Sequence, residues 1–346
     1  MSEKILQQLP APLLGWYDAA RRHLPWRETV SPYRTWVSEI MLQQTRVSAV
    51  IPYFERFMDA LPTVEALATA EESQLLALWQ GLGYYSRARN LQKAAKTIVN
   101  DLGGLFPDTY EELLKLTGVG EYTAGAIASI AFHRPVPAVD GNVLRVAARL
   151  TDCSDNILNE AVRRRFREEL SQIIPRDRPG DFNQALMELG ALVCLPNTEP
   201  KCEVCPCRGF CLAYARGHQT ELPVREKDKG KRKEEKTVFI LRRGEYEAVR
   251  QRPKEGLLAS LWEYPNVEGT LNEQQAAAQL SEWNTIPHKW LKTAHKKHIF
   301  THIVWEMTVY AIDIMGEGCS AWSWRNEENA ENYPMPTAFS KLRREK

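Results

Sequence analysis

The stretch that decides the fold reads LTGVGEYTAG and occupies residues 116–125. Helices are predicted on both sides of it, over residues 110–115 and 122–132. Gly118 and Gly120 permit positive φ angles and leave backbone N–H groups bare, and the N-terminus of the second helix adds a partial positive charge. The segment therefore predicts a grip on phosphates that does not depend on base sequence. An ordinary connection between two helices has the same pattern.

A carboxylate follows this segment further along the chain. In VDGNV, residues 139–143, Asp140 precedes a predicted helix over residues 142–150. Aspartate is a good N-cap, because its side chain accepts a hydrogen bond from the first helical turn. The same helix N-terminus keeps the carboxylate ionised and aimed. A capping role and a catalytic role are therefore compatible for Asp140.

The chain before this segment carries a long helical pattern. From Arg34 to Ala49, apolar residues recur at steps of three and four, behind Ser31 and Pro32, which are usual at a helix start. Glu39 falls within this stripe, where burial raises the pKa of a carboxyl group. A glutamate on the solvent face of the same helix fits the spacing as well. Further helices are predicted over residues 64–70, 72–80, 87–100, 159–173 and 182–193.

Length and composition set limits on the whole chain. Its 346 residues exceed one ordinary core and predict two or three domains. The formal net charge is +1, so a DNA-binding function must rest on local patches and not on a basic chain. The absence of a signal peptide or a long apolar run from the sequence predicts a soluble protein of the cytoplasm.

The cysteines gather in one short region. Five of the seven lie between Cys194 and Cys211, which argues against disulfides and for a metal site. Cys194, Cys202, Cys205 and Cys211 leave gaps of seven, two and five residues. Four thiolates in this order suit a [4Fe–4S] cluster with one cysteine per iron, or a tetrahedral zinc ion. Cys207 is a fifth thiol, either a spectator or a substitute ligand.

A charged segment precedes the C-terminal part. Residues 225–236 contain no apolar residue and are typical of a solvated linker, with a strip that touches DNA phosphates as the alternative. Beyond it, residues 237–241, 246–250 and 303–314 have strand patterns, and residues 272–283 have a helical one. The sequence therefore predicts a mainly α fold followed by a smaller α+β domain.

These features, in this order, resemble the helix-hairpin-helix DNA glycosylases that carry an iron–sulfur loop. Four segments narrow the resemblance to the MutY-type adenine DNA glycosylases: PWR at 25–27, WVSEIMLQQTRV at 36–47, GLGYYSR at 81–87 and DFNQALM at 181–187. In the C-terminal part, GLLASLWEYP at 256–265 resembles the Nudix-like domain of that family. The first cysteine gap is one residue longer than usual, and Phe-Thr-His at 300–302 replaces the common Phe-Ser-His.

The resemblance implies the chemistry of the site. Glu39 would protonate adenine N7, and Asp140 would stabilise the sugar cation, by its charge or through a transient covalent bond. Asn142 and Tyr122 would support them. Tyr122 stands where related bifunctional glycosylases have a lysine that forms a Schiff base, which a phenol cannot form. A monofunctional enzyme follows, which excises adenine opposite 8-oxoguanine or guanine and leaves an abasic site.

The resemblance also implies how DNA is held once the adenine is flipped out of the duplex. The adenine pocket would comprise Leu24, Trp26, Arg27 and Gln184. The gap left in the duplex would be filled, and the orphan 8-oxoguanine contacted, by Gln44, Leu82 and Tyr84. The residues that read 8-oxoguanine from the C-terminal domain would be Phe300, Thr301 and His302. Further DNA contacts would come from Thr45, Gly118 and Gly120. For the tryptophan and leucine residues, plain core packing is the alternative.

The implied organisation has four parts. Residues 25–133 would form a six-helix domain with the hairpin, and residues 1–24 and 134–216 the domain with the [4Fe–4S] cluster on Cys194, Cys202, Cys205 and Cys211. Residues 217–235 would form a charged linker, and residues 236–346 a Nudix-like domain for 8-oxoguanine. That domain lacks glutamates at the helical spacing of a Nudix metal site, so no pyrophosphatase activity is expected.

The expected partner is double-stranded DNA with an A:8-oxoguanine or A:G mispair, bound by a monomer associated with the bacterial nucleoid. One rival function is a bifunctional glycosylase of the endonuclease III type, which Tyr122 and the long C-terminal part oppose. The other is a non-catalytic iron–sulfur protein that binds DNA, which the presence of both Glu39 and Asp140 opposes.

Overall fold

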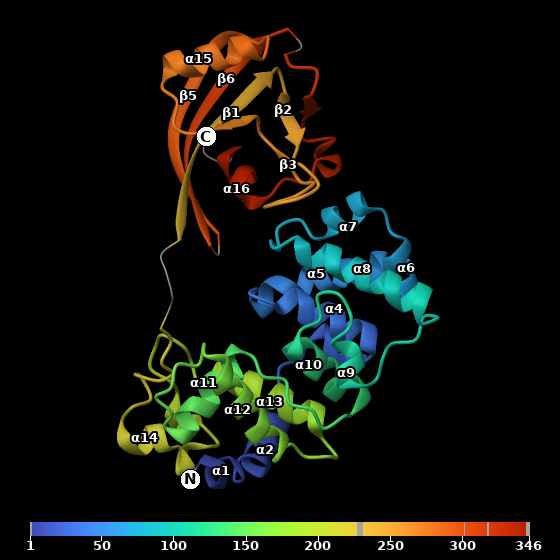
Figure 1. Ribbon diagram of the computed structural model, residues 1–346, viewed down its shortest axis with the longest axis vertical. Helices are drawn as coiled ribbons and strands as arrows, with labels where there is room; N and C mark the ends of the chain where they lie inside the picture. The colour runs from blue at the N-terminus through green and yellow to red at the C-terminus, as the bar shows by residue number, and fades with distance from the viewer. Residues whose placement is uncertain (1, 227–230, 301, 317, 344–346) are drawn as a thin grey trace. The chain divides into compact units, whose positions relative to one another are not determined.

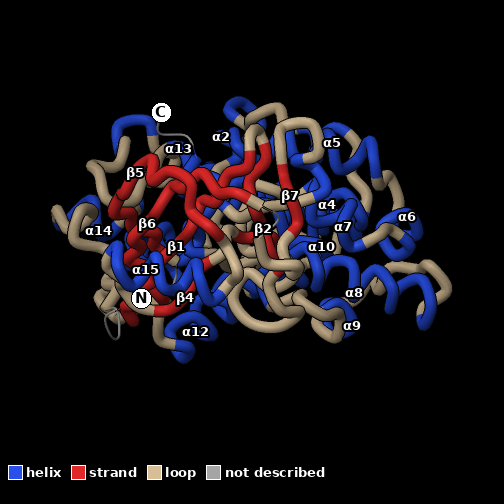
Figure 2. The backbone as a smooth tube through the Cα atoms, turned by 90° about the horizontal axis from the view of Figure 1, so that it is seen from above, coloured by secondary structure: helices blue, strands red, loops and turns tan. Residues whose placement is uncertain are grey.

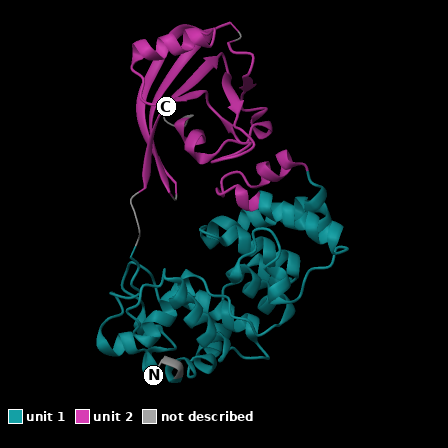
Figure 3. Cartoon of the chain, viewed as in Figure 1, with its two compact units in different colours: residues 1–70, 89–228 teal, residues 71–88, 229–346 magenta. Residues whose placement is uncertain are grey.

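The computed structural model describes residues 2–226, 231–300, 302–316 and 318–343 (Figure 1). The chain divides into two compact units, residues 1–70 with 89–228 and residues 71–88 with 229–346 (Figure 3). Figure 2 shows the strands, in red, gathered in one region, and these strands all belong to the second unit. The first unit includes the two predicted N-terminal domains except for residues 71–88, and the division of these domains at residue 133 stays a prediction.

Helices account for the regular structure up to residue 216. They are α1 (Ser2–Leu6), α2 (Pro10–Ala20), α3 (Pro25–Glu28), α4 (Pro32–Leu42), α5 (Val47–Ala60), α6 (Val64–Thr69), α7 (Glu72–Leu78), α8 (Ser86–Asp101), α9 (Tyr110–Leu113), α10 (Glu121–Phe132), α11 (Gly141–Thr151), α12 (Glu160–Ser171), α13 (Pro179–Leu192) and α14 (Leu212–Arg216). Two 3₁₀ turns, η1 (Cys202–Val204) and η2 (Arg208–Phe210), lie among the cysteines. The predicted mainly α fold is confirmed, and most predicted helices are displaced by only a few residues.

The single helix predicted from Arg34 to Ala49 is wrong. Ser31 caps α4 as expected, by accepting a hydrogen bond from the N–H of Arg34. However, α4 ends at Leu42, and Gln44 has a left-handed φ of 57° before α5 begins. α4 packs against both α10 and α5, so the chain must fold back on itself between the two helices. Continuous apolar spacing in the sequence does not reveal such a break.

Only one of the two glycines in the hairpin between α9 and α10 has a positive φ angle. Gly118 has a φ of +80°, and a Cβ there would lie 2.7 Å from Cβ of Asn90 in α8. Gly120 is the N-cap of α10 with a φ of −95°, so the positive φ expected there is wrong. Both glycines are exposed, while Leu116 and Val119 are buried beneath them.

Helices α11 and α13 pack closely and position the end of α11. The expected cap is confirmed, because Asp140 accepts a hydrogen bond of 2.7 Å from the N–H of Val143. A Cβ at Gly190 of α13 would lie 2.6 Å from Cβ of Asn142, so only glycine permits this approach. Apolar residues from α1, α2, α11 and α13 form one buried cluster, which includes Cys207.

The second unit is built around a seven-stranded sheet in the order β3-β2-β1-β6-β5, with β4 paired to β1 and β7 to β2 (Figure 2). Its strands are β1 (Arg232–Arg243), β2 (Tyr246–Gln251), β3 (Trp262–Glu263), β4 (Asn266–Glu268), β5 (Ile286–Ile299), β6 (Ile303–Met315) and β7 (Ser323–Arg325). β1 and β6 are parallel. α15 (Glu273–Glu282) packs on one face and α16 (Thr337–Ser340) on the other, each over its own apolar cluster.

The predicted linker at residues 217–235 is wrong at its C-terminal end, because β1 already begins at Arg232. Alternate side chains explain this start. Glu234 accepts a hydrogen bond of 2.8 Å from the indole N–H of Trp305, and the Lys236 ammonium lies 5.0 Å from the centre of the same ring. The start of β1 was not predicted because its residues are charged, although Glu234 and Lys236 pack against Trp305. No helix in the described parts of the chain has the length and apolar character needed to cross a membrane.

Candidate active site

A cavity of about 680 Å³ opens in the first unit, within the size range of ligand sites. Its walls come from α3, α4, α10 and α13, from the break between α4 and α5, and from the start of α11. The predicted residues that line it are Leu24, Trp26, Arg27, Glu39, Gln44, Thr45, Tyr122, Asp140, Asn142 and Gln184. The structure thus brings the two carboxylates, distant in sequence, to one cavity.

Glu39 is held at this cavity as a buried carboxyl group. Only 5% of it is exposed, so the alternative of a glutamate facing solvent is wrong. The hydroxyl of Tyr122, from the first turn of α10, donates a hydrogen bond to Oε2. Burial raises the pKa of Glu39 to about 7, with the charge of Asp140 adding to this rise and the Tyr122 hydrogen bond opposing it. Glu39 therefore titrates near neutral pH.

Asp140 has a different environment, because hydrogen bonds hold both of its oxygens. Oδ1 accepts from the N–H of Val143 and Oδ2 from the side-chain amide of Asn142, each at 2.7 Å. Burial raises the pKa of Asp140, while these hydrogen bonds and the guanidinium of Arg145 act to lower it. The carboxylate is only partly buried, since it opens on the cavity.

A polar wall faces these carboxylates from α13. Glu188 is 1% exposed and binds both Arg22, at 2.8 Å from Nε, and Arg27, at 2.8 Å from Nη2. Within the described residues, Nε of Arg27 and Oγ1 of Thr35 are buried and have no hydrogen-bond partner. Both residues line the cavity, but these two atoms are covered by other protein atoms.

A chain of hydrogen bonds joins Asp140 to the cysteine loop. The side-chain oxygen of Asn142 accepts from Nη2 of Arg145 at 2.9 Å, and Nε of Arg145 donates to the carbonyl oxygen of Cys194 at 2.8 Å. Arg149, one turn further along α11, donates to the sulfur of Cys194 at 3.2 Å. Both arginines are buried, so this contact fixes the cysteine loop against α11.

The cysteines fit an iron–sulfur cluster by their chemistry and position. Cys194, Cys202, Cys205 and Cys211 line one small cavity with Cys207, and its wall also includes apolar residues of α11 and α13 and the side chain of Arg149. Among the described residues, no three His, Cys, Asp or Glu side chains are placed to hold a metal ion. In a [4Fe–4S] cluster each cysteine binds a different iron, so the four sulfurs need not converge on one point.

Known proteins are similar in sequence to this chain over most of its length. Adenine DNA glycosylase of Rattus norvegicus is 35% identical over 395 aligned positions, covering 95% of this chain and 76% of that protein. Adenine DNA glycosylase of Buchnera aphidicola subsp. Baizongia pistaciae is 33% identical, covering 95% of this chain and 94% of that protein. The chain belongs to the adenine DNA glycosylase family. It is therefore an N-glycosyl hydrolase of base excision repair.

Sequence profiles and solved structures agree with this membership. The profile described as "HhH-GPD superfamily base excision DNA repair protein" matches residues 37–172, and that of the NUDIX domain matches residues 237–345. A thermostable thymine-DNA glycosylase has a TM-score of 0.55 at 29% identity, covering 62% of this chain and 97% of that chain. Endonuclease III in a non-covalent DNA complex has a TM-score of 0.54 at 23% identity, covering 63% and 98%, and shares the fold.

Other predicted DNA contacts of this glycosylase lie outside the cavity wall. Gly118 and Gly120 lie on the exposed hairpin. Leu82 is buried and Tyr84 is 44% exposed, in the segment 71–88 that groups with the second unit. In the second unit, Phe300 is partly buried and His302 exposed at the turn between β5 and β6, whereas Thr301 lies outside the described residues.

Sequence reasoning missed the roles that three residues have at the glycosylase site. Arg22 and Glu188 line the cavity, and Arg145 links Asn142 to the cysteine loop. Glu188 follows the segment DFNQALM on α13, one helical turn after Gln184, so it shares a face with a residue that was predicted. That spacing was a usable signal. Arg145 gave none, because an arginine in an amphipathic helix is normally placed at the surface.

Proposed function

We propose that this glycosylase excises adenine mispaired with 8-oxoguanine or guanine, after flipping the adenine into the cavity of the first unit. The observation that carries the proposal is the position of Glu39 and Asp140 on one cavity, with one hydrogen bond donated to Glu39 by Tyr122 and two donated to Asp140 by Val143 and Asn142. Arg22, Arg27 and Gln184 add polar side chains to the wall of the same cavity.

Glu39 is the proposed acid. Its pKa of about 7 leaves a large fraction protonated at neutral pH. Because Tyr122 donates to Oε2, the proton of Glu39 belongs on Oε1. Transfer of this proton to adenine N7 makes the base a better leaving group, and the electron pair of the N-glycosidic bond departs with adenine.

Asp140 is the proposed partner of the sugar cation left behind. Loss of adenine gives the deoxyribose oxocarbenium character, which a nearby carboxylate stabilises. Hydrogen bonds from Val143 and Asn142 favour the ionised form and fix its direction. Water then adds to the sugar, with or without a transient covalent bond to Asp140. The proton that the water loses returns to the Glu39 carboxylate, and an abasic site is left.

The enzyme is proposed to be monofunctional. A lyase needs an amine that attacks the sugar and forms a Schiff base. Tyr122 occupies the hairpin position, and the described residues that line the cavity include no lysine. We therefore expect the excision product to keep its DNA strand intact until alkali cleaves it.

The second unit is proposed to recognise 8-oxoguanine through the turn between β5 and β6. Phe300 offers an aromatic ring, and the exposed His302, two residues further along the chain, offers a hydrogen-bonding side chain. Aromatic side chains stack on bases, and histidine hydrogen-bonds to their edges. Tyr84, with the guanidinium of Arg87 5.4 Å from its ring centre, and Leu82 and Gln44 are the proposed contacts around the orphan base.

Cys194, Cys202, Cys205 and Cys211 are proposed to hold a [4Fe–4S] cluster. When bound, the cluster supplies four covalent anchors that fix the loop of residues 194–211. The hydrogen bonds from Arg145 and Arg149 then carry this rigidity to α11, which begins at Asp140. We also propose that the protein acts as a monomer on nucleoid DNA in a bacterial cytoplasm.

The test is a duplex with one adenine opposite 8-oxoguanine, incubated with the purified protein and then divided. One half is heated with alkali, and the other half is not. Wild type should break the strand only in the heated half, and Glu39→Gln should leave both intact while still binding the duplex. A break without alkali would contradict the monofunctional assignment, and an intact duplex with wild type would contradict the proposed activity.

A further inference from the structure

We propose that Trp305 of β6 is a positioning residue that sets the orientation of the Phe300 ring and thereby the preference for 8-oxoguanine over guanine. This inference rests on the proposed recognition of 8-oxoguanine by Phe300 and His302. Trp305 is 1% exposed, so any effect it has on DNA must pass through a neighbour. Its ring centre lies 4.8 Å from that of Phe300, with the planes at 72°.

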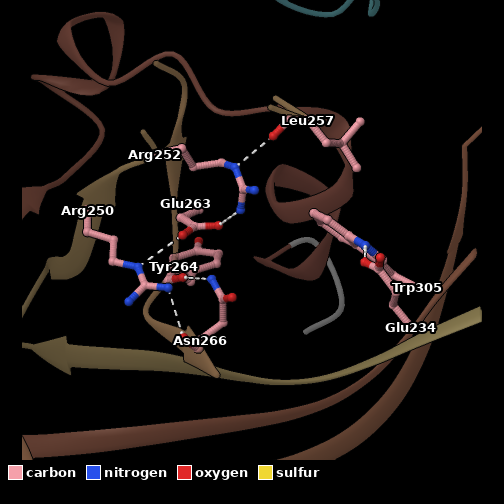
Figure 4. A network of polar contacts seen from close by, with 8 residues as sticks. All are labelled: Glu234, Arg250, Arg252, Leu257, Glu263, Tyr264, Asn266 and Trp305. Carbon is pink, nitrogen blue, oxygen red and sulfur yellow. Dashed lines mark hydrogen bonds and ion pairs between the residues drawn. The ribbon is translucent and has the colours of Figure 1, made fainter. Parts of the chain in front are cut away.

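Several neighbours hold the indole of Trp305 in one orientation, as expected of a side chain that positions the Phe300 ring. Its N–H donates to Oε2 of Glu234 at 2.8 Å, as Figure 4 shows. The Lys236 ammonium lies 5.0 Å and the Arg252 guanidinium 5.7 Å from the ring centre, and Phe339 of α16 packs at 5.8 Å. A cation is attracted to the negative face of an aromatic ring, so Lys236 and Arg252 both help to hold the indole in place.

Arg252 is itself held in place by two acceptors. It binds the buried carboxylate of Glu263 through Nη1 and the backbone oxygen of Leu257 through Nε, at 3.0 Å (Figure 4). Arg250 binds the same carboxylate at 2.9 Å from the other side. The cation beside Trp305 therefore belongs to a network that leaves it little freedom.

The ring of Phe300 depends on its aromatic neighbours for its direction. Its backbone is held separately, because its N–H donates to the carbonyl of Ile303 and its own carbonyl accepts from Lys231, both at 2.8 Å. The ring lies between Trp305 and His298, whose ring centre is 4.6 Å away. His298 of β5 and Trp305 of β6 are paired in the sheet. The register of these two strands therefore fixes the positions of the two rings that contact Phe300.

Loss of the Trp305 ring should therefore release the ring of Phe300 while its backbone stays in place. A stacking partner that rotates freely holds a base less well, because ordering it on binding costs entropy. Such a loss weakens recognition of 8-oxoguanine more than excision itself, since Glu39 and Asp140 belong to the other unit. The measurable quantity is the ratio of single-turnover excision rates on A:8-oxoguanine and A:G duplexes.

The experiment compares Trp305→Leu, which removes the aromatic contact, with Trp305→Phe, which keeps an aromatic ring and loses the bond to Glu234. We expect Trp305→Leu to lower the ratio about two- to tenfold, the size of one aromatic contact, and Trp305→Phe to restore most of it. Trp283→Leu is the matched control. Trp283 packs on Phe239 and Trp322 in the cluster beneath α15, on the opposite face of the sheet.

The outcomes separate this inference from the proposed function. Phe300→Ala and His302→Ala should both lower the ratio, and an unchanged ratio in both would refute recognition by this turn and the inference with it. If they lower the ratio but Trp305→Leu keeps that of wild type, only the role of Trp305 is overturned. An equal fall in Trp283→Leu would also overturn it, because general loss of packing would then explain the result.

Discussion

At the scale of single residues, we expect the proposed pair of Glu39 and Tyr122 to determine how the rate of excision depends on pH. The acid must be protonated, so the rate should fall as pH rises through about 7. The Tyr122 hydrogen bond lowers the pKa of Glu39, so Tyr122→Phe should move this alkaline limb to higher pH. Single-turnover rates measured from about pH 5 to about pH 9 test this. A limb at the same pH in both proteins would show that Glu39 is not the group being titrated.

The same carboxyl group should also affect stability. Its pKa is raised from 4.5 to about 7, so the folded chain binds the proton more tightly than the unfolded chain does. Stability from this group is present at low pH and is lost as pH rises from about 4.5 to about 7, by about 3 kcal/mol at most. Glu39→Gln removes the titration, so the free energy of unfolding of the variant relative to wild type should be higher at pH 8 than at pH 5. Denaturant unfolding at the two pH values measures this, and no difference would argue against a buried, titrating Glu39.

At the scale of elements, the contact between α11 and α13 places Asp140 and its partner Asn142. A Cβ at Gly190 would lie 2.6 Å from Cβ of Asn142, so Gly190→Ala must separate the two helices. We expect it to cost about 1–3 kcal/mol of stability and to slow excision. Gly15→Ala in α2 is the control, because a Cβ there meets nothing within 4 Å, and helical alanine should add about 0.5–1 kcal/mol. Thermal unfolding and excision rates of both variants decide this, and equal behaviour would contradict the close approach.

The elements also show what could be read from the sequence. Helices such as α8, α11 and α13 followed from apolar spacing, and the cap at Asp140 from its residue type. The break at Gln44 did not, because it results from α4 and α5 packing on each other. Strand β5 was missed, since it is an edge strand with exposed lysines and histidines and has little apolar alternation. Tertiary contacts, which the local sequence pattern does not contain, determine both the break at Gln44 and the pairing of β5.

The candidate site was predicted residue by residue through its resemblance to a family, and only partly by physical argument. Spacing alone left Glu39 either buried or exposed, and the structure buries it against Tyr122. The wall of Arg22 and Glu188 joins α13 to the segment after α2, which no local pattern connects. The charge balance of +1 gave no sign of DNA binding. Convergence of distant segments is what the sequence by itself did not specify.

At the scale of the whole molecule, we propose that the first unit carries excision and that the turn between β5 and β6 of the second unit reads 8-oxoguanine. A chain that ends after residue 226 lacks all of β1 and the sheet that follows. We expect two effects in this shortened chain. The ratio of its excision rates on A:8-oxoguanine and A:G should fall, and it should fall by a larger factor than the rate on A:G itself. Circular dichroism should first confirm that the helices of the shortened chain are folded. An undiminished preference would contradict recognition by the second unit.

The central claim is that Glu39 and Asp140 act on one flipped adenine as a unit. Its most direct test is the single-turnover excision rate of wild type, Glu39→Gln, Asp140→Asn and the double variant, on a duplex with adenine opposite 8-oxoguanine. We predict that each single variant loses about a thousandfold or more while still binding DNA, and that the double variant is little slower than the slower single one. Wild-type rates in either single variant, or losses that multiply in the double, would contradict the claim.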